Sequence, residues 1–283
     1  MAPLSTPDRN AGVNLLDRLR ALFPDASRRS VKQWLEAGRV EVNGRVARDG
    51  RVSVSSRDKV ALVGRGRVPF PRGLGLVHED EAIVVVDKPP RLLTVATERE
   101  RERTVYRLLW DYLAAGRPPA RPFIVHRLDR DTSGILVLAK TPEAKAKLQA
   151  QFEARRVERI YVALVAGRVG RDSGTLVSRL AEDRSLRVST ARGADGRTAI
   201  TAYRVLARGA DTTRLELSLG TGRRRQIRAQ LAAIGHPVVG DREHGGPAGR
   251  HGRLCLHATR LGFVHPGTGK AVRFESTAPA PWV

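Results

Sequence analysis

The chemically richest stretch of the chain runs from His126 to Gly134 and reads His-Arg-Leu-Asp-Arg-Asp-Thr-Ser-Gly. It places two carboxylates, Asp129 and Asp131, among two arginines, a histidine and two hydroxyl groups. The apolar residues 135–139 follow at once and predict a buried strand. Ionised side chains avoid a protein interior unless they are paired. This polar cluster at the mouth of a buried strand therefore indicates a pocket that uses a positioned carboxylate.

Two basic clusters further along the chain are candidates for the same pocket. Residues 155–161 form a basic run that leads to Tyr161 at the start of a predicted strand. Residues 220–228 place three adjacent arginines at the predicted start of a helix, where the helix dipole favours anions. A nucleic-acid phosphate bound at this end would explain them, although Arg224 and Arg225 taken singly fit an exposed charged helix equally well.

Arg228 is the arginine of this region that is best placed to meet a carboxylate. The predicted apolar side of its helix contains Ile227, Leu231 and Ile234, which puts Arg228 at the edge of the buried face. Pairing with an arginine lowers the pKa of an aspartate and keeps it ionised. An ionised, fixed carboxylate can act as a nucleophile or a base. These arguments leave both aspartates of the first cluster open, and they leave a purely structural ion pair open as well.

The composition of the chain points to a polyanionic partner. Lys and Arg number 51 against 29 Asp and Glu, a net charge of +22, which favours nucleic acid. Apolar residues make up 41%, enough for a sizeable core and too many for wholesale disorder. The single cysteine, Cys255, excludes an internal disulfide and a cysteine-based zinc site, and we interpret it as a buried apolar residue.

Membrane and export signals are missing from the sequence. No apolar run approaches the length of a membrane span. The N-terminal residues lack the apolar stretch of a signal peptide. We therefore expect a cytoplasmic protein that does not contact a membrane.

The chain divides by composition into four parts. We expect a flexible N-terminus over 1–13, a small module over 14–63, a Gly- and Pro-rich linker over 64–75 and a large domain over 76–283. In the small module, two helices precede a hairpin around an Asn-Gly pair. Four basic residues would crowd one side of its helix pair and contact phosphate: Arg28, Arg29, Lys32 and Arg39.

The large domain is richer in strands than in helices, and the two do not alternate regularly. This order predicts an α+β fold with a mixed, mainly antiparallel sheet, flanking helices and a central basic cleft. The expected strands lie at 82–87, 135–139, 161–166, 215–219 and within 254–274. The expected helices lie at 104–114, from 141 through about 152, and at 226–234.

Taken together, these motifs resemble the RluA-type pseudouridine synthases. The motif at 126–134 looks like the family signature, and further blocks follow in the family's order over nearly all of 76–283: 86–89, 159–163, 222–228, 235–241, 256–258 and 265–269. The small module resembles the RNA-binding module of ribosomal proteins and tyrosyl-tRNA synthetases. The chain departs from the family pattern at four positions: Arg91, Arg225, Gln230 and His244.

The resemblance implies a role for each matching residue. Asp129 would be the catalytic aspartate, Arg228 its partner, and Tyr161 the residue that stacks on the target base and helps to remove its carbon-5 proton. Arg127 would fill the gap that a flipped-out uridine leaves in its helix. Three further residues would shape the turn or the substrate pocket: Thr132, Arg223 and Ile227. Arg224 and Arg225 would contact RNA.

The implied reaction breaks the bond between ribose and uracil, rotates the base and rejoins it through carbon 5. It needs no metal and no cofactor, in agreement with the absence of P-loop and dinucleotide-binding motifs. We expect a monomer that acts on large-subunit ribosomal RNA. The alternatives are a tRNA-directed synthase and a catalytically silent RNA-binding or ribosome-assembly protein. An RNA methyltransferase would need a Gly-rich cofactor loop that the sequence lacks.

Overall fold

The computed structural model describes residues 12–24, 26–36, 38–62, 70–98, 100–114, 120–183, 188–191, 196–279 and 282. The chain separates into two compact units, residues 1–69 and 70–283. Most of the expected flexible N-terminus and positions 64–69 of the expected linker lie outside the described residues. Within the described residues, no helix has the length and apolar character needed to cross a membrane.

The small unit contains helices α1 (Leu15–Leu22) and α2 (Arg28–Glu36). Each helix begins at a capping side chain, because Asn14 accepts the backbone N–H of Asp17 and Ser27 that of Ser30. Apolar residues at helical spacing meet apolar strand residues to form the core: Leu15, Leu19, Val31, Leu35, Val40 and Val54.

Short strands complete this unit. Strand β2 (Val40–Val42) pairs with β3 (Arg45–Ala47) and with β5 (Val60–Leu62), and β1 (Val13–Asn14) pairs with β4 (Ser53–Val54). The two residues between β2 and β3 both have positive φ, 54° for Asn43 and 79° for Gly44. This is the turn that an Asn-Gly pair predicts in a hairpin.

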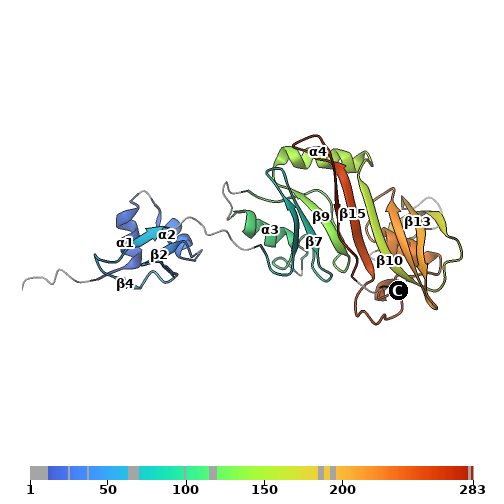
Figure 1. Cartoon of the computed structure of the whole chain (residues 1–283), viewed down its shortest axis with the longest axis horizontal. Helices are drawn as coiled ribbons and strands as arrows, with labels where there is room; N and C mark the ends of the chain where they lie inside the picture. The colour runs from blue at the N-terminus through green and yellow to red at the C-terminus, as the bar shows by residue number, and fades with distance from the viewer. Residues whose placement is uncertain are drawn as a thin grey trace, which may run out of the picture. The chain divides into compact units, whose positions relative to one another are not determined.

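The larger unit is built on a sheet with eleven strands among its described residues (Figure 1). Along the sheet the order is β12 (Val188–Thr190), β11 (Ser173–Glu182), β13 (Arg197–Arg208), β14 (Thr212–Leu219), β10 (Glu158–Ala166), β15 (Leu256–Val264), β9 (Ser133–Ala139), β7 (Ile83–Lys88) and β6 (Gly75–Glu79). Two strands lie off this path: β16 (Ala271–Glu275) on β15 and β8 (Phe123–Ile124) on β9. The pairs are antiparallel except for β9 with β15, which confirms the expected mixed sheet.

Strands β7 and β9 are buried on both faces, which explains their unbroken apolar runs. One set of alternating side chains packs against α3 (Val105–Ala114): Val84, Val86, Leu136 and Leu138. The other set packs against α4 (Pro142–Glu153): Ile83, Val85, Ile135 and Val137. Strand β9, which begins at Ser133 within the motif at 126–134, is therefore held between two helices, so the end of that motif has a fixed position.

Helix α5 (Gln226–Ala233) differs from the expected helix with one apolar side. All residues from Gln226 to Leu231 are buried, whereas Ile234 lies just past the helix and is 43% exposed. The two buried glutamines, Gln226 and Gln230, are tolerated inside because they bond to the backbone of β13. Gln230, for example, donates to the carbonyl of Ala199 at 3.1 Å and accepts the hydroxyl of Thr201 at 2.6 Å.

The expected linker ends earlier than the sequence predicts. The rings of Phe70 and Tyr112 meet edge to face with centroids 5.1 Å apart, and Leu74 is buried. Strand β6 then begins at Gly75. Two apolar anchors therefore join residues 70–75 to the larger unit, whereas the sequence predicts a poorly packed chain for this part of the linker.

Candidate active site

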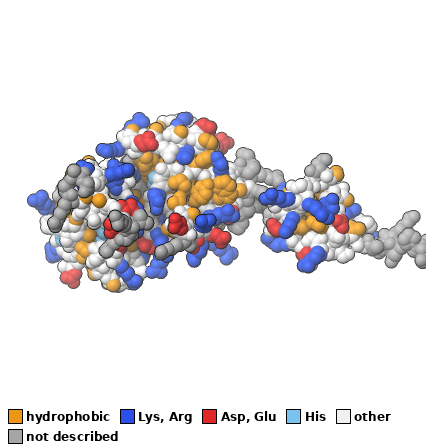
Figure 2. Space-filling view, turned by 180° about the vertical axis from the view of Figure 1, so that it is seen from behind, with side chains coloured by type: hydrophobic (Ala, Val, Ile, Leu, Met, Phe, Trp, Pro, Cys, Tyr) orange, Lys and Arg blue, Asp and Glu red, His pale blue; other side chains and the backbone are white. Residues whose placement is uncertain are grey.

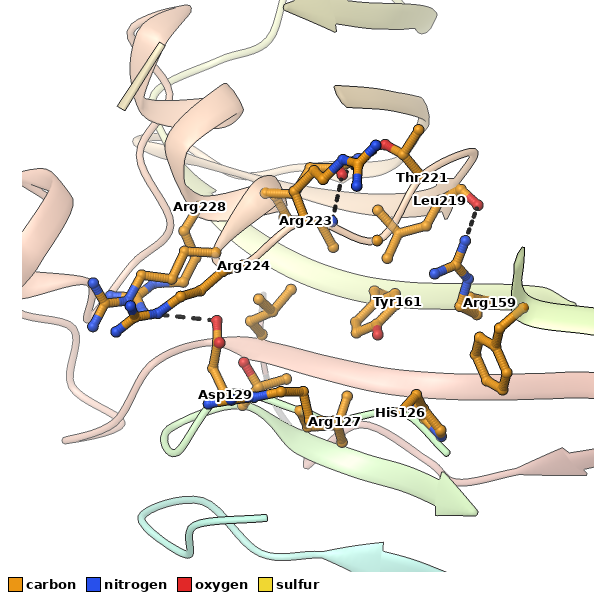
Figure 3. A pocket seen from close by; sticks show the side chains of 18 of the residues that line it. His126, Arg127, Asp129, Arg159, Tyr161, Leu219, Thr221, Arg223, Arg224 and Arg228 are labelled. Carbon is orange, nitrogen blue, oxygen red and sulfur yellow. Dashed lines mark hydrogen bonds and ion pairs between the residues drawn. The ribbon is translucent and has the colours of Figure 1, made fainter. Parts of the chain in front are cut away.

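A cavity of about 480 Å³ opens beside the start of β9. It brings together the three candidate clusters of the sequence, which come from the β8–β9 loop, from β10 and from the start of α5 (Figure 3). All predicted substrate and catalytic residues of the large domain line it: Arg127, Asp129, Thr132, Tyr161, Arg223, Ile227 and Arg228, together with Arg224 and Arg225. We call this cavity the cleft.

The structure separates the two aspartates of the signature motif. Asp129 lines the cleft with Tyr161, whereas Asp131 lines a second cavity, of about 330 Å³, with Arg91 and Arg253. The two carboxylates that the residue types left on equal terms therefore lie in different cavities. Of the two, Asp129 is the one that a molecule in the cleft can reach.

The backbone around Asp129 is tied down on both sides. The hydroxyl of Thr94 donates to the carbonyl of Leu128 at 2.8 Å, and the ammonium of Lys88 donates to that of Arg130 at 3.0 Å. The Thr132 N–H donates to the Asp129 carbonyl at 3.2 Å and closes a turn. These bonds fix the position from which the Asp129 carboxylate enters the cleft.

Gly134 is required for the close approach of β9 to β15. Its φ is +113°, and a Cβ at this position would collide with the backbone of Ala258. One residue earlier, the hydroxyl of Ser133 bonds to Nδ1 of His257 at 2.8 Å. Burial lowers the pKa of His257, which favours a neutral ring in this bond. The end of the signature motif is thus anchored to β15.

Lys88 is fully buried and holds three backbone carbonyls. Its ammonium donates to Pro89 at 2.9 Å, Leu92 at 2.8 Å and Arg130 at 3.0 Å. Burial lowers its pKa to about 7, although the negative charges of Asp131 and Asp129 act in the opposite direction. The three acceptors match the three N–H groups of an ammonium.

We expect Lys88→Met to lower the free energy of unfolding by about 3 kcal/mol, because three buried carbonyls lose their donor at once. Urea denaturation of the full chain measures the change. Lys270→Met, at an exposed position, serves as the control and should stay within about 0.5 kcal/mol of the wild type. A Lys88→Met protein as stable as this control would contradict the role assigned to the ammonium.

Arg228 is buried and its principal partner is Asp241. Its guanidinium donates from Nε and Nη2 to the two carboxylate oxygens of Asp241 at 2.7 and 2.6 Å. It also donates to Glu243 at 3.1 Å and lies 3.9 Å from the carboxylate of Asp129. The expected pair with Asp129 is therefore the longest of three ion pairs, and sequence reasoning missed the other two.

Asp241 stays ionised in this environment. Burial opposes the charge, but hydrogen bonds from Arg228 and His244 outweigh burial and hold the pKa of Asp241 well below its usual range. The ion pair with Asp241 uses Nε and Nη2 of the Arg228 guanidinium and fixes its orientation. The remaining nitrogen, Nη1, is the one that faces Asp129. The sequence did contain a pointer to Asp241, because this aspartate ends the family-like block 235–241.

Tyr161 lies between the two ends of the cleft (Figure 3). It belongs to β10, next to an irregularity in the pairing with β15, and its side chain is almost wholly buried. Burial raises its pKa to about 12, and the positive charge of Arg159 only partly opposes this. At neutral pH the residue is therefore a phenol, with its ring on the cleft wall.

Two of the three adjacent arginines before α5 contact carboxylates of the chain itself. The side chain of Arg224 pairs with Glu182, and that of Arg225 pairs with Glu243. Arg225 has a left-handed φ of 50°, so the helix begins only after it. The open anion site expected at this helix end is therefore partly filled by acidic side chains, and contact of Arg224 and Arg225 with RNA stays a prediction.

Three of the four basic residues that are predicted to contact phosphate lie on α2, and the fourth follows it. Arg28, Arg29 and Lys32 are exposed on α2, whereas Arg39 follows the helix and lies over the ring of Trp34, 5.7 Å from its centroid. Lys and Arg side chains are prominent on both units in the view of Figure 2. The exposed α2 residues fit the predicted phosphate contacts, which stay a prediction.

Outside the cleft, three potential metal ligands lie together: His78, Asp80 and His265. The atoms that could bind a metal already take part in hydrogen bonds. Nδ1 of His265 accepts two backbone N–H groups, from Gly267 and Thr268, so its proton resides on Nε2, which bonds to Asp80 at 2.8 Å. A metal on Nε2 would need an imidazolate. The cluster therefore fits a hydrogen-bonded brace of the 265–269 turn better than a metal site.

Comparison with known proteins agrees with this geometry. The chain matches the RNA pseudouridylate synthase family over residues 82–233 and the S4 domain over residues 14–60. It belongs to the RNA pseudouridylate synthase family, whose members are isomerases.

Bacterial relatives that carry the name ribosomal large subunit pseudouridine synthase D align over most of the chain. The protein of Pseudomonas aeruginosa is 36% identical over 288 residues, which cover 95% of this chain and 89% of the relative. That of Pasteurella multocida is 34% identical over 292 residues, which cover 96% and 90%.

Solved structures share the fold of the larger unit. Human RNA pseudouridylate synthase domain containing 4 superposes with a TM-score of 0.62 at 21% identity over 73% of this chain and 89% of its own. Human RNA pseudouridylate synthase domain containing 1 gives 0.60 at 26% identity over 72% and 83%.

Proposed function

We propose that this pseudouridine synthase modifies uridines of large-subunit ribosomal RNA, with Asp129 as the catalytic carboxylate. The observation that carries the assignment is the convergence of Asp129, Tyr161 and Arg228 on one cleft from three distant segments. The S4 domain and the names of the bacterial relatives support the choice of substrate.

In this proposal the target uridine flips out of its helix and enters the cleft. Arg127, exposed at the cleft, takes the place of the base. The uracil lies between Tyr161 and Ile227, both almost wholly buried apart from their cleft surfaces. The carboxylate of Asp129 then faces the ribose and the base.

The proposed reaction is an isomerisation, so no atom is gained or lost overall. The bond between N1 of uracil and C1′ of ribose breaks, and a bond between C5 and C1′ forms. The proton on C5 leaves, and N1 gains a proton. Asp129 supplies the carboxylate for this exchange, while Arg228, 3.9 Å away, orients it.

The substrate assignment is tested by mapping pseudouridines in ribosomal RNA and tRNA from a strain that lacks the gene. We expect one or more large-subunit sites to lose pseudouridine and to regain it when the wild-type gene is returned. Loss confined to tRNA would favour the tRNA-directed alternative. No change at any uridine would favour a catalytically silent RNA-binding protein.

The role of Tyr161 is tested by two substitutions. Tyr161→Phe keeps the ring and removes the hydroxyl, so we expect kcat to fall by about 10²–10⁴ if the phenol takes part in proton transfer, with KM little changed. Tyr161→Leu removes the stacking surface and should raise KM as well. Tritium release from RNA labelled at C5 of uridine measures both constants. A Tyr161→Phe enzyme with wild-type kcat would limit the residue to stacking.

A further inference from the structure

The cleft continues past Tyr161 to an end that the proposed reaction does not use. Figure 3 shows Asp129 and Arg228 at one end and Arg159 with His126 at the other, with Tyr161 between them. Phe152 lines the same end. We call these three residues, Arg159, His126 and Phe152, the distal end of the cleft.

The charge of Arg159 has no carboxylate partner within the described part of the chain, in contrast with Arg224, Arg225 and Arg228. Its Nη2 donates to the carbonyl of Leu219 at 3.2 Å, and its Nε is buried without a hydrogen-bond partner. Burial lowers its pKa, the phenol of Tyr161 acts in the opposite direction, and the positive charge of Arg155 adds to the effect of burial. A half-buried cation with unused donors is complementary to an anion.

Two neighbouring rings, those of Phe152 and His126, hold the guanidinium of Arg159 in place. The guanidinium lies over the ring of Phe152, 5.8 Å from its centroid, and His126 stacks on the same ring at 4.7 Å. Burial lowers the pKa of His126 to about 3, and its Nε2 accepts the N–H of Val137, so the ring is neutral. The loop between β14 and α5 also approaches the guanidinium, since a Cβ at Gly222 would lie 2.5 Å from Nη1 of Arg159 and would displace it.

The distance along β10 suits a single nucleotide step. Arg159 and Tyr161 are two residues apart on this strand, a separation of about 7 Å, and both line the cleft. A base that stacks on Tyr161 therefore places the phosphate of an adjoining nucleotide within reach of Arg159. Each nucleotide of RNA carries such an anion.

We propose that the distal end binds a backbone phosphate of a nucleotide next to the target uridine and thereby positions that uridine over Asp129. The inference rests on the proposed function, since it assumes that RNA occupies the cleft. Arg159 is a binding and positioning residue in this assignment, and it takes no part in bond exchange.

The first test compares Arg159→Gln and Arg159→Lys with Arg168→Gln, a control at an exposed arginine beyond the other end of β10. Unmodified large-subunit ribosomal RNA, transcribed with tritium at C5 of uridine, is the substrate. We expect Arg159→Gln to raise KM about tenfold and to reduce the slope of log KM against log salt by about 1. We expect a much smaller change in kcat, an intermediate KM for Arg159→Lys and no change for the control.

The second test removes the phosphate charge from the substrate. A synthetic RNA hairpin that contains the mapped uridine carries one neutral methylphosphonate at each flanking position in turn. For the wild type, one replacement should weaken binding about tenfold, and the same replacement should have less than about a twofold effect on Arg159→Gln. Equal effects on both proteins at every position would overturn the proposal.

The outcomes separate this proposal from the one on which it rests. A wild-type enzyme that forms no pseudouridine contradicts the proposed function. An active wild type with an Arg159→Gln variant of unchanged KM and salt slope contradicts only the distal site. A fall in kcat at unchanged KM would assign Arg159 to the chemistry and would also overturn the proposed phosphate site at the distal end. If Arg159→Gln does not fold, Arg159→Lys and the methylphosphonate series on the wild type decide.

Discussion

Asp129→Asn is expected to lower pseudouridine formation by at least about 10⁴-fold. The substitution keeps the size of the side chain and removes the carboxylate that the proposed reaction requires, and loss of a central catalytic group has effects of this size in other enzymes. Stability should change little, because Arg228 keeps its bonds to Asp241 and Glu243 when the 3.9 Å contact with Asp129 is weakened.

The matched control for this variant is Asp131→Asn. Asp131 belongs to the same motif but lines the second cavity, so we expect a rate within about tenfold of the wild type. Single-turnover tritium release measures both rates, and thermal melting verifies that each variant is folded. In cells, Asp129→Asn should fail to restore the missing pseudouridine. Full restoration by this variant would refute the assigned mechanism.

The parts of the molecule that depend on local pattern could be predicted from the sequence. The apolar run after Gly134 forms β9, and Asn43-Gly44 forms a hairpin turn. In each case the information lies within a few residues, as periodicity or as turn chemistry. The fold class followed from the irregular order of strands and helices.

The parts that depend on long-range pairing could not be predicted. Arg224 meets Glu182, 42 residues away, and nothing near either residue indicates its partner. Asp129 and Asp131 are the same residue type and lie two positions apart, so the sequence cannot distinguish them. In the fold they line different cavities. Arg159 was visible in a basic run before Tyr161, but its unbalanced charge appears only when its surroundings are known.

The pairing of Arg228 with Asp241 leads to the largest expected loss of stability. Asp241→Asn would leave a buried guanidinium with Glu243 and the more distant Asp129 as its remaining anionic partners. Removal of one partner from a buried ion pair typically destabilises a protein by about 3–5 kcal/mol. We also expect kcat to fall, because Arg228 would move toward Asp129 and pull its carboxylate out of position.

Asp172→Asn is the matched control. The Asp172–Arg208 pair has the same 2.6 Å separation as Asp241–Arg228, but Asp172 is 88% exposed, and exposed pairs contribute about 0–1 kcal/mol. Urea denaturation of the full chain should therefore separate the two variants by about 3 kcal/mol. Equal losses would show that burial does not strengthen the Arg228 pair.

The dependence on pH provides an independent check. Because Asp241 has a depressed pKa in the folded protein, its stabilising effect is fully present above the unfolded value of about 3.9 and is lost as the pH falls toward the folded pKa. The stability difference between wild type and Asp241→Asn should thus be constant from about pH 7 to 5 and should shrink below about pH 4. A difference that persists unchanged at pH 2.5 would mean that the loss comes from altered packing and not from the Asp241 charge.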